Sequence, residues 1–101
     1  MEIALKRCSA WIAAGDASAP LNLSYLRLDA LPDLPMSLQK LDCSHNDLTA
    51  LPELPRALEI LDCSYNGLTT LAGLPPGLKY LVYSADNAVD LPAGVMCVEA
   101  V

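Results

Sequence analysis

Leucine recurs at every twentieth position through most of this chain, and this spacing restricts the fold more than any other feature of the sequence. Three sets of leucines keep the period: Leu38, Leu58 and Leu78; Leu41, Leu61 and Leu81; and Leu31, Leu51, Leu71 and Leu91. The dipeptides Leu34-Pro35, Leu54-Pro55 and Leu74-Pro75 keep it as well. A fixed period of this length indicates one small structural unit repeated along the chain, each burying its apolar side against the next.

The repeated unit reads L-x-x-L-x-C-S-x-N-x-L-T-x-L-P-x-L-P, and its first six positions predict a short strand. Alternate side chains of a strand point to opposite faces, and neighbouring strands lie about 4.8 Å apart. Leu41, Leu61 and Leu81 should therefore form one buried column. Asn46 and Asn66 follow the strands, and their amides can donate to and accept from the backbone where the chain turns.

The second half of the unit, Leu-Pro-x-Leu-Pro, predicts an extended or polyproline-like return path. Proline fixes φ, lacks an N–H donor and disfavours helix in the residue before it. Residues 18–37 read as a degenerate first coil. At the other end, Val98 and Val101 lie one further period after Leu78 and Leu81, so the sequence predicts that the chain stops just as another strand begins.

The unit that starts at Leu78 departs from the pattern. Tyr83 takes the place of the repeated cysteine, Asp86 that of the asparagine and Ala88 that of a leucine. We expect this unit to be distorted or to be the place where the stack of units ends.

The N-terminal segment, 1–15, follows a different period. Ile3, Ala4, Cys8, Trp11 and Ile12 recur with a helical spacing, which predicts a helix. Gly15 is a helix C-terminal signal. We expect this helix to cover the apolar column at the open end of the first coil, with Trp11 among the side chains that pack against it.

A cleaved signal peptide is the alternative for the same segment. Lys6 and Arg7 precede a short apolar stretch, and Ala17-Ser18-Ala19 resembles a cleavage site. The stretch is at the lower limit of length for a signal peptide, and Asp16 interrupts it before the cleavage site. The sequence therefore favours the helix.

Together these patterns predict a leucine-rich-repeat solenoid. Its concave side should be a short parallel β-sheet, its convex side extended or polyproline-like, and its N-terminus a capping helix. We expect the capping helix over residues 1–16 and repeats of 20-residue period over residues 17–101, in about four coils with the last incomplete. With 53% hydrophobic and 18% charged residues, the chain has enough apolar material for one domain with a core.

Side chains that alternate with the buried leucines should line the sheet, and we call this surface the concave face. It grades from polar at Lys40 and Asp42 to apolar at Ile60, Tyr80 and Val82. The candidate partner-binding residues on it are Lys40, Asp42, His45, Ile60, Asp62, Tyr65, Tyr80 and Val82. One column reads Pro20, Lys40, Ile60, Tyr80 and Ala100, a second Asn22, Asp42, Asp62 and Val82, and a third Tyr25, His45, Tyr65 and Ala85. Aromatic and aliphatic residues exposed on a rigid sheet favour protein binding. The alternative is that the aspartates merely solvate the sheet and the apolar residues raise its strand propensity.

The sequence predicts no catalytic, metal or cofactor site. Cys43 and Cys63 share one inward repeat position, which favours a role as small buried hydrophobes. Without a nearby histidine or further cysteine they cannot complete a tetrahedral zinc site. Cys8 and Cys97 lie towards opposite ends of the chain, so we expect all four thiols to be reduced, as in a cytosolic protein. His45, the single histidine, has no nucleophile motif beside it.

The acidic balance excludes two further classes of partner. The net charge is −6, with six basic against twelve acidic residues. Nucleic-acid binding and anionic membrane surfaces both require clustered Lys and Arg. No apolar run approaches the roughly 18 residues that suggest a membrane span.

The period and the Leu-Pro punctuation resemble those of bacterial LPX-type leucine-rich-repeat effectors, the IpaH/YopM kind delivered by type III secretion. The resemblance covers roughly residues 18–95. The matching segments are 31–35, 51–55 and 71–75, where Ala72 breaks the pattern, and the strand-and-turn segments 41–49 and 61–69. It implies recognition of a host protein through the repeats. Some members also have a C-terminal E3 ubiquitin ligase domain, which would need several hundred residues that do not follow Leu91 here.

The expected function is therefore non-catalytic binding of a protein partner through the concave face, in the cytoplasm or after delivery into a host cytoplasm. One alternative is a substrate-recognition fragment of a ubiquitin-ligase effector. Another is a self-assembling fragment that dimerises through its C-terminal strand, because an unpaired strand edge tends to pair with another chain.

Overall fold

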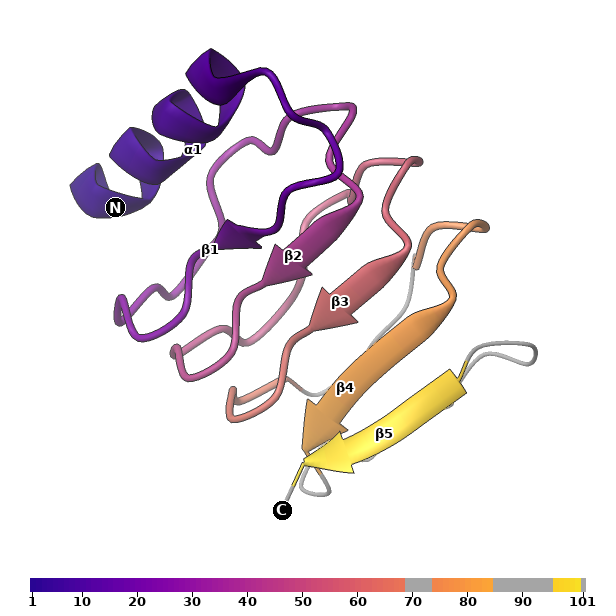
Figure 1. Cartoon of the computed structure of the whole chain (residues 1–101). Coiled ribbons are helices and arrows are strands. Elements are labelled where there is room, and N and C mark those ends of the chain that lie inside the picture. Colours follow the sequence, from indigo (N-terminus) through magenta and orange to yellow (C-terminus); the bar gives the residue numbers. More distant parts are fainter. Residues whose placement is uncertain (69–73, 85–95, 101) are drawn as a thin grey trace.

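The computed structural model describes residues 1–68, 74–84 and 96–100 and shows a helix followed by a parallel sheet (Figure 1). Helix α1 spans Glu2–Ala14. The strands follow in chain order and pair only with their neighbours in sequence, in the order β1-β2-β3-β4-β5. Their bounds are Leu21–Asn22 for β1, Lys40–Asp42 for β2, Ile60–Asp62 for β3, Tyr80–Ser84 for β4 and Met96–Ala100 for β5.

The predicted column of leucines is present. Across β1 to β4 the register pairs Leu21 with Leu41, Leu41 with Leu61 and Leu61 with Leu81, so each strand lies one repeat period after the last. All four side chains are at most 2% exposed. Burying a leucine stabilises a fold by about 1.5–3 kcal/mol, and here the same pocket recurs at every rung. The periodic leucines therefore build a continuous core.

The return segments are extended, as the prolines predict. Residues 31–35 and 51–55 contain no helix, and a turn at residues 36–37 and 56–57 leads back to the sheet. Each turn is closed by a backbone hydrogen bond, from the Leu38 N–H to the Pro35 carbonyl at 3.2 Å and from the Leu58 N–H to the Pro55 carbonyl at 3.1 Å. Proline accepts in these bonds and is never required to donate.

Helix α1 lies beside β1 at the first end of the sheet (Figure 1). Gly15 ends it in the left-handed conformation, with φ 71°, and its N–H donates to the Ile12 carbonyl. Ala4 and Cys8 are buried against the core, and Trp11 packs partly buried beside them. The wider apolar stripe predicted from the sequence is wrong at Ile3 and Ile12, which are 56% and 61% exposed. The helix contacts a strand of two residues, which covers only a narrow stripe.

The C-terminal register differs from the prediction. Strand β5 is fully paired with β4, and Leu81 lies opposite Cys97, a step of sixteen residues. Tyr80 therefore pairs with Met96, not with Ala100, and Val98 lies opposite Val82. The expectation that the chain stops as a strand begins is wrong, because three residues separate Pro92 from Met96 whereas seven separate Pro32 from Lys40. The sequence after Pro92 lacks the second Leu-Pro dipeptide, and β5 begins four residues earlier than the period predicts.

Two other features of the chain complete the description. None of the described segments forms a helix with the length and apolar character that crossing a bilayer requires. Asp86 and Ala88, the predicted departures from the repeat, lie outside the described residues, as does Ala85. Tyr83, which stands in the cysteine position, packs partly buried against the core.

Candidate binding face

The parallel register brings six of the candidate residues onto one face of three neighbouring strands. Lys40, Ile60 and Tyr80 lie side by side, and Asp42, Asp62 and Val82 form the adjacent column. They alternate with the buried leucines of the same strands. Tyr80 is 45% exposed, and the other five side chains are half-buried.

Asp42 and Asp62 have a structural role that the sequence analysis missed. The Oδ1 atom of Asp42 accepts hydrogen bonds from the N–H and the hydroxyl of Ser44, at 3.0 and 2.6 Å. Asp62 accepts the same pair from Ser64, at 3.1 and 2.6 Å. In such a turn the side-chain oxygen accepts from a backbone N–H at the point where the strand ends. Its sequence signal, an Asn or Asp two residues before a Ser, recurs at every rung from Asn22 to Asp62.

His45 and Tyr65, the other two candidates, form a stack of rings with Tyr25 just beyond the ends of the strands. The centroids of the Tyr25 and His45 rings are 4.2 Å apart, and those of His45 and Tyr65 are 4.3 Å apart. All three residues have positive φ, between 54° and 57°. We call Tyr25, His45 and Tyr65 the ring stack. The ring stack lies next to the column of Asp42 and Asp62 and adds aromatic side chains to the concave face.

Two asparagines, the buried Asn46 and the half-buried Asn66, hold the backbone of the turns that carry the ring stack. The amide of Asn46 donates to the carbonyls of Leu23, Cys43 and Ser44, while its oxygen accepts from the N–H groups of Leu26 and Leu28. Asn66 repeats the pattern one rung later, where its amide donates to the carbonyls of Cys43, Cys63 and Ser64. Each asparagine therefore links its own turn to the turn of the preceding rung, as its repeat position predicts.

Of the two lysines near the concave face, only Lys79 forms an ion pair within the described residues. Lys79 lies 3.7 Å from Glu59 in an ion pair at the start of the strands. The pKa of Asp16 is lowered, first by hydrogen bonds from the Ser18 hydroxyl and amide and further by the charge of Lys40. The positive charge of Lys40 therefore helps to stabilise the ionised form of Asp16. No ion pair reaches Asp42 or Asp62 from the described residues.

The cysteines of the repeat face the core, not the candidate binding face. Cys8, Cys43 and Cys63 are free thiols, and the last two are fully buried. Burial raises the pKa of the Cys43 thiol well above its ordinary value and that of Cys63 to about 12. Buried neutral thiols are poor nucleophiles and poor metal ligands. The described residues also contain no group of three His, Cys, Asp or Glu that could hold a metal ion.

Arg7 fastens α1 to the sheet and Trp11 fastens it to the segment before β1, and sequence reasoning identified neither hydrogen bond. In the sheet interior, the N–H of Leu23 reaches the Asp42 carbonyl and that of Cys43 reaches the Asp62 carbonyl. The corresponding Asn22 carbonyl at the sheet end accepts instead from the Arg7 guanidinium at 3.0 Å. The Trp11 indole N–H donates to the Ala19 carbonyl at 2.8 Å. Arg7 thus supplies a donor that a preceding strand would otherwise provide.

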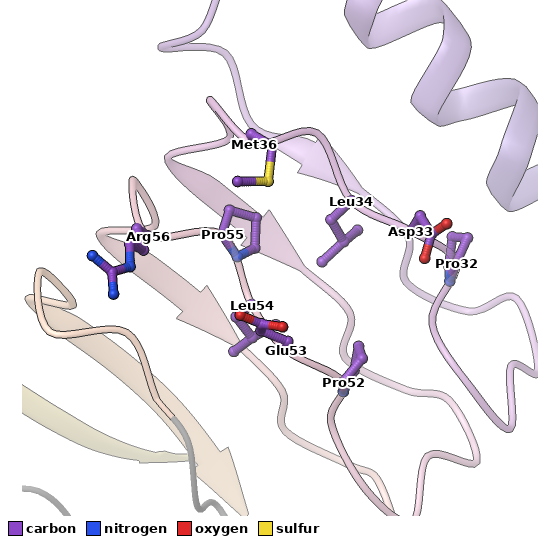
Figure 2. Close-up of a pocket in the computed structure, with 9 residues that line it drawn as sticks. All are labelled: Pro32, Asp33, Leu34, Met36, Pro52, Glu53, Leu54, Pro55 and Arg56. Atoms are coloured by element: carbon purple, nitrogen blue, oxygen red, sulfur yellow. The ribbon is translucent and has the colours of Figure 1, made fainter.

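A hollow lies between two return segments, on the side of the molecule opposite the concave face. It encloses about 420 Å³. Figure 2 shows Pro32 and Asp33 at one end, Arg56 at the other, and Leu34 and Pro55 between them. Its walls come from the Leu-Pro-x-Leu-Pro segments and from Met36. The lining residues come from equivalent positions of two successive repeats, so this hollow follows from the repeat itself.

Comparison with known proteins agrees with this geometry. A family model described as leucine-rich repeats, in two copies, matches residues 37–76. The solved structure of a Shigella effector leucine-rich-repeat domain superposes with a TM-score of 0.81 at 33% sequence identity, covering 93% of this chain and 44% of that one. The chain thus spans less than half the length of the structure it matches. No curated protein matches the sequence. The repeat register, the leucine column and these matches establish that the chain is folded as a leucine-rich-repeat solenoid.

Proposed function

We propose that this chain is a non-catalytic module that binds a protein partner through its concave face. The residues proposed to contact the partner are Lys40, Asp42, His45, Ile60, Asp62, Tyr65, Tyr80 and Val82. Tyr25 joins them, because its ring is the first member of the ring stack. Leucine-rich-repeat domains are generally interaction modules, and the Shigella domain that this chain resembles belongs to a bacterial effector.

The exposure of large aromatic side chains over a rigid sheet is the observation that supports this proposal. Tyr25 is 70% exposed, Tyr80 45% and Tyr65 42%. Binding hot spots are enriched in tyrosine because its ring contributes a large contact area with few rotatable bonds. The backbone beneath is fixed by the strand ladder and by the hydrogen bonds of Asn46 and Asn66. A partner would therefore meet a preformed surface, which lowers the entropic cost of association.

The match to an effector domain also suggests where this module acts. We propose that it is an LPX-type repeat domain, delivered by type III secretion, with a host protein as its partner in the host cytoplasm. The segments 31–35 and 51–55, which form the extended returns, support the LPX assignment.

Position-specific photo-cross-linking tests the binding proposal. A photoreactive amino acid is placed at position 80 on the concave face, and in a matched variant at position 36, where Met36 is exposed on the opposite side. We expect a protein adduct in host-cell lysate from position 80 and none from position 36. Tyr80→Ala and Ile60→Asp should abolish capture of that protein by the unmodified chain while leaving the circular dichroism spectrum unchanged. Capture that survives both substitutions would remove the proposal.

Self-association is a second candidate, supported by the position of β5. This strand is last in the sheet order, and within the described residues its outer edge has no strand partner. Exposed edges can pair with a second chain. Light scattering at high protein concentration would give the mass of a dimer if β5 pairs in this way and the mass of a monomer if it does not.

A further inference from the structure

We propose that the concave face binds a basic segment of its partner, with arginine or lysine side chains held by Asp42 and Asp62 and packed against the surrounding tyrosines. This inference rests on the proposed function and specifies the chemistry of the partner. The evidence is a negative charge that the fold does not need, placed beside exposed aromatic rings.

The first rung shows that the fold needs only an oxygen at this position. There Asn22 accepts the hydrogen bonds from the N–H and hydroxyl of Ser24, at 2.9 and 2.6 Å. Asp42 makes the same two bonds to Ser44 at 3.0 and 2.6 Å. An amide oxygen therefore serves the turn as well as a carboxylate oxygen does. The negative charges in the second and third rungs are not required by the turn.

Those charges also lie where they oppose folding. Asp42 is directly opposite Asp62 in the neighbouring strand. Like charges in directly opposed positions destabilise a sheet. Of the nearby lysines, Lys79 pairs with Glu59, and Lys40 forms no ion pair with either aspartate within the described residues. A cationic group placed between the two aspartates would relieve their repulsion.

The aromatic rings around this pair suit the same kind of group. Tyr80 lies opposite Ile60, so it is diagonal to Asp62 on the same face, within reach of a long side chain bound to that carboxylate. The ring stack lies three residues beyond the aspartates, on the other side of them. Arginine and lysine bind favourably over tyrosine rings, and arginine also pairs with carboxylates through two parallel hydrogen bonds.

Charge complementarity over a longer range supports a basic protein segment as the occupant. The chain has a net charge of −6, which attracts a cationic partner and speeds its association. A metal ion is disfavoured, because no third His, Cys, Asp or Glu joins the two aspartates within the described residues. An extended segment with basic side chains at alternate positions could place two of them over neighbouring rungs.

Fluorescence anisotropy with defined peptides tests the inference. The probes are ten-residue peptides in which glycine alternates with arginine, with lysine or with glutamate. The key variant is the double substitution Asp42→Asn and Asp62→Asn, which keeps the turn hydrogen bonds that Asn22 makes. Its matched control is Asp33→Asn with Glu53→Gln, which removes two negative charges from exposed positions on the opposite side of the molecule.

We expect the arginine and lysine peptides to bind the wild-type chain and the glutamate peptide not to bind. The Asp42/Asp62 variant should weaken arginine-peptide binding at least fivefold, and the control variant less than twofold. Equal weakening by the two variants would show diffuse attraction and would overturn the inference. So would an arginine peptide that fails to bind, or a calcium ion that displaces it at micromolar concentration.

A measurement on the unmodified chain keeps the inference testable if a variant unfolds. Titration of the ¹⁵N-labelled wild-type chain with the arginine peptide should shift the amide signals of residues 42–45 and 62–65. The amides of residues 33 and 53 should stay in place, and the reverse pattern would refute the inference. If a cross-linked partner depends on Tyr80 but not on Asp42 and Asp62, the proposed function survives and the inference of a basic segment fails.

Discussion

The imidazole of His45 lies against the phenol ring of Tyr25, with centroids 4.2 Å apart and planes 10° from parallel. On its other side the same imidazole lies 4.3 Å from Tyr65. The contact requires an unusual backbone, because all three residues occupy the left-handed region that glycine prefers. The hydrogen bond from the His45 N–H to the Ser64 carbonyl at 3.0 Å continues the strand ladder through this region. Stacking therefore offsets backbone strain.

Substitutions at His45 should separate the stacking from the strain. His45→Ala and His45→Gly both remove the ring, but only glycine adopts φ near 54° without a steric penalty. We expect His45→Gly to be more stable than His45→Ala by about 1 kcal/mol. Urea denaturation followed by the fluorescence of Trp11, the single tryptophan, gives the difference. The same pair of substitutions at Asp47, which has no positive φ, should favour alanine. Glycine and alanine of equal stability at position 45 would contradict the strain argument.

Replacing Asn46 should be among the most damaging single changes. Its buried amide bonds to three carbonyls and two N–H groups from two rungs, and Asn46→Ala leaves several of them without a partner. A buried polar group left unsatisfied costs about 1–3 kcal/mol, so we expect a loss of about 3 kcal/mol or more in the free energy of unfolding. Asp47→Ala, at the exposed neighbouring position, serves as the control and should change stability by less than about 0.5 kcal/mol. Similar unfolding midpoints for the two variants would show that water replaces the amide.

The central strand should distinguish core residues from surface residues. Leu61 is 0% exposed in the middle of the leucine column, and its neighbour Ile60 lies half-buried on the concave face. Leu61→Ala should cost about 2–5 kcal/mol because it opens a cavity between rungs. Ile60→Ala should cost much less and act mainly on partner binding. Urea denaturation of both variants, with circular dichroism to check the fold, measures the contrast, and equal losses would mean that Ile60 is a core residue.

The periodic parts of the fold were predictable from sequence because one structural unit recurs with one spacing. Leucines at every twentieth position specify the register of β1 to β4 and the buried column. The prolines specify the extended returns, and Gly15 the end of α1. Each of these residue types sets the backbone or burial of its own position, and the leucines and prolines do so again in every repeat.

The parts of the structure that do not repeat could not be predicted from the sequence in the same way. The step from Leu81 to Cys97 breaks the period, although the missing second Leu-Pro dipeptide after Pro92 was a readable signal. The contact of Arg7 with the Asn22 carbonyl joins a helix to a sheet edge, and no spacing in the sequence encodes it. The ring stack was visible as a column of residues, but its stacking depends on left-handed backbone at each turn.

The buried thiols make the stability of this fold sensitive to alkaline pH. Burial raises the pKa of Cys63 from 9.0 to about 12 and that of Cys43 well above 9.0. In the unfolded chain both thiols ionise near their ordinary pKa, whereas in the folded chain they stay protonated. Their contribution to stability is therefore complete below about pH 9 and is lost as the pH rises toward the folded pKa, at roughly 1.4 kcal/mol per pH unit for each thiol.

Cys43→Ala combined with Cys63→Ala tests this dependence. The variant should be less stable at pH 7, because two buried side chains shrink, yet its stability should fall less steeply between pH 8.5 and 10.5. Lysines and tyrosines titrate in the same range in both proteins, so the difference between the two slopes reports the thiols. Urea midpoints at half-unit pH intervals give both slopes. Parallel slopes would mean that water reaches Cys43 and Cys63 and that the cysteine positions of the repeat are not sealed inside the solenoid.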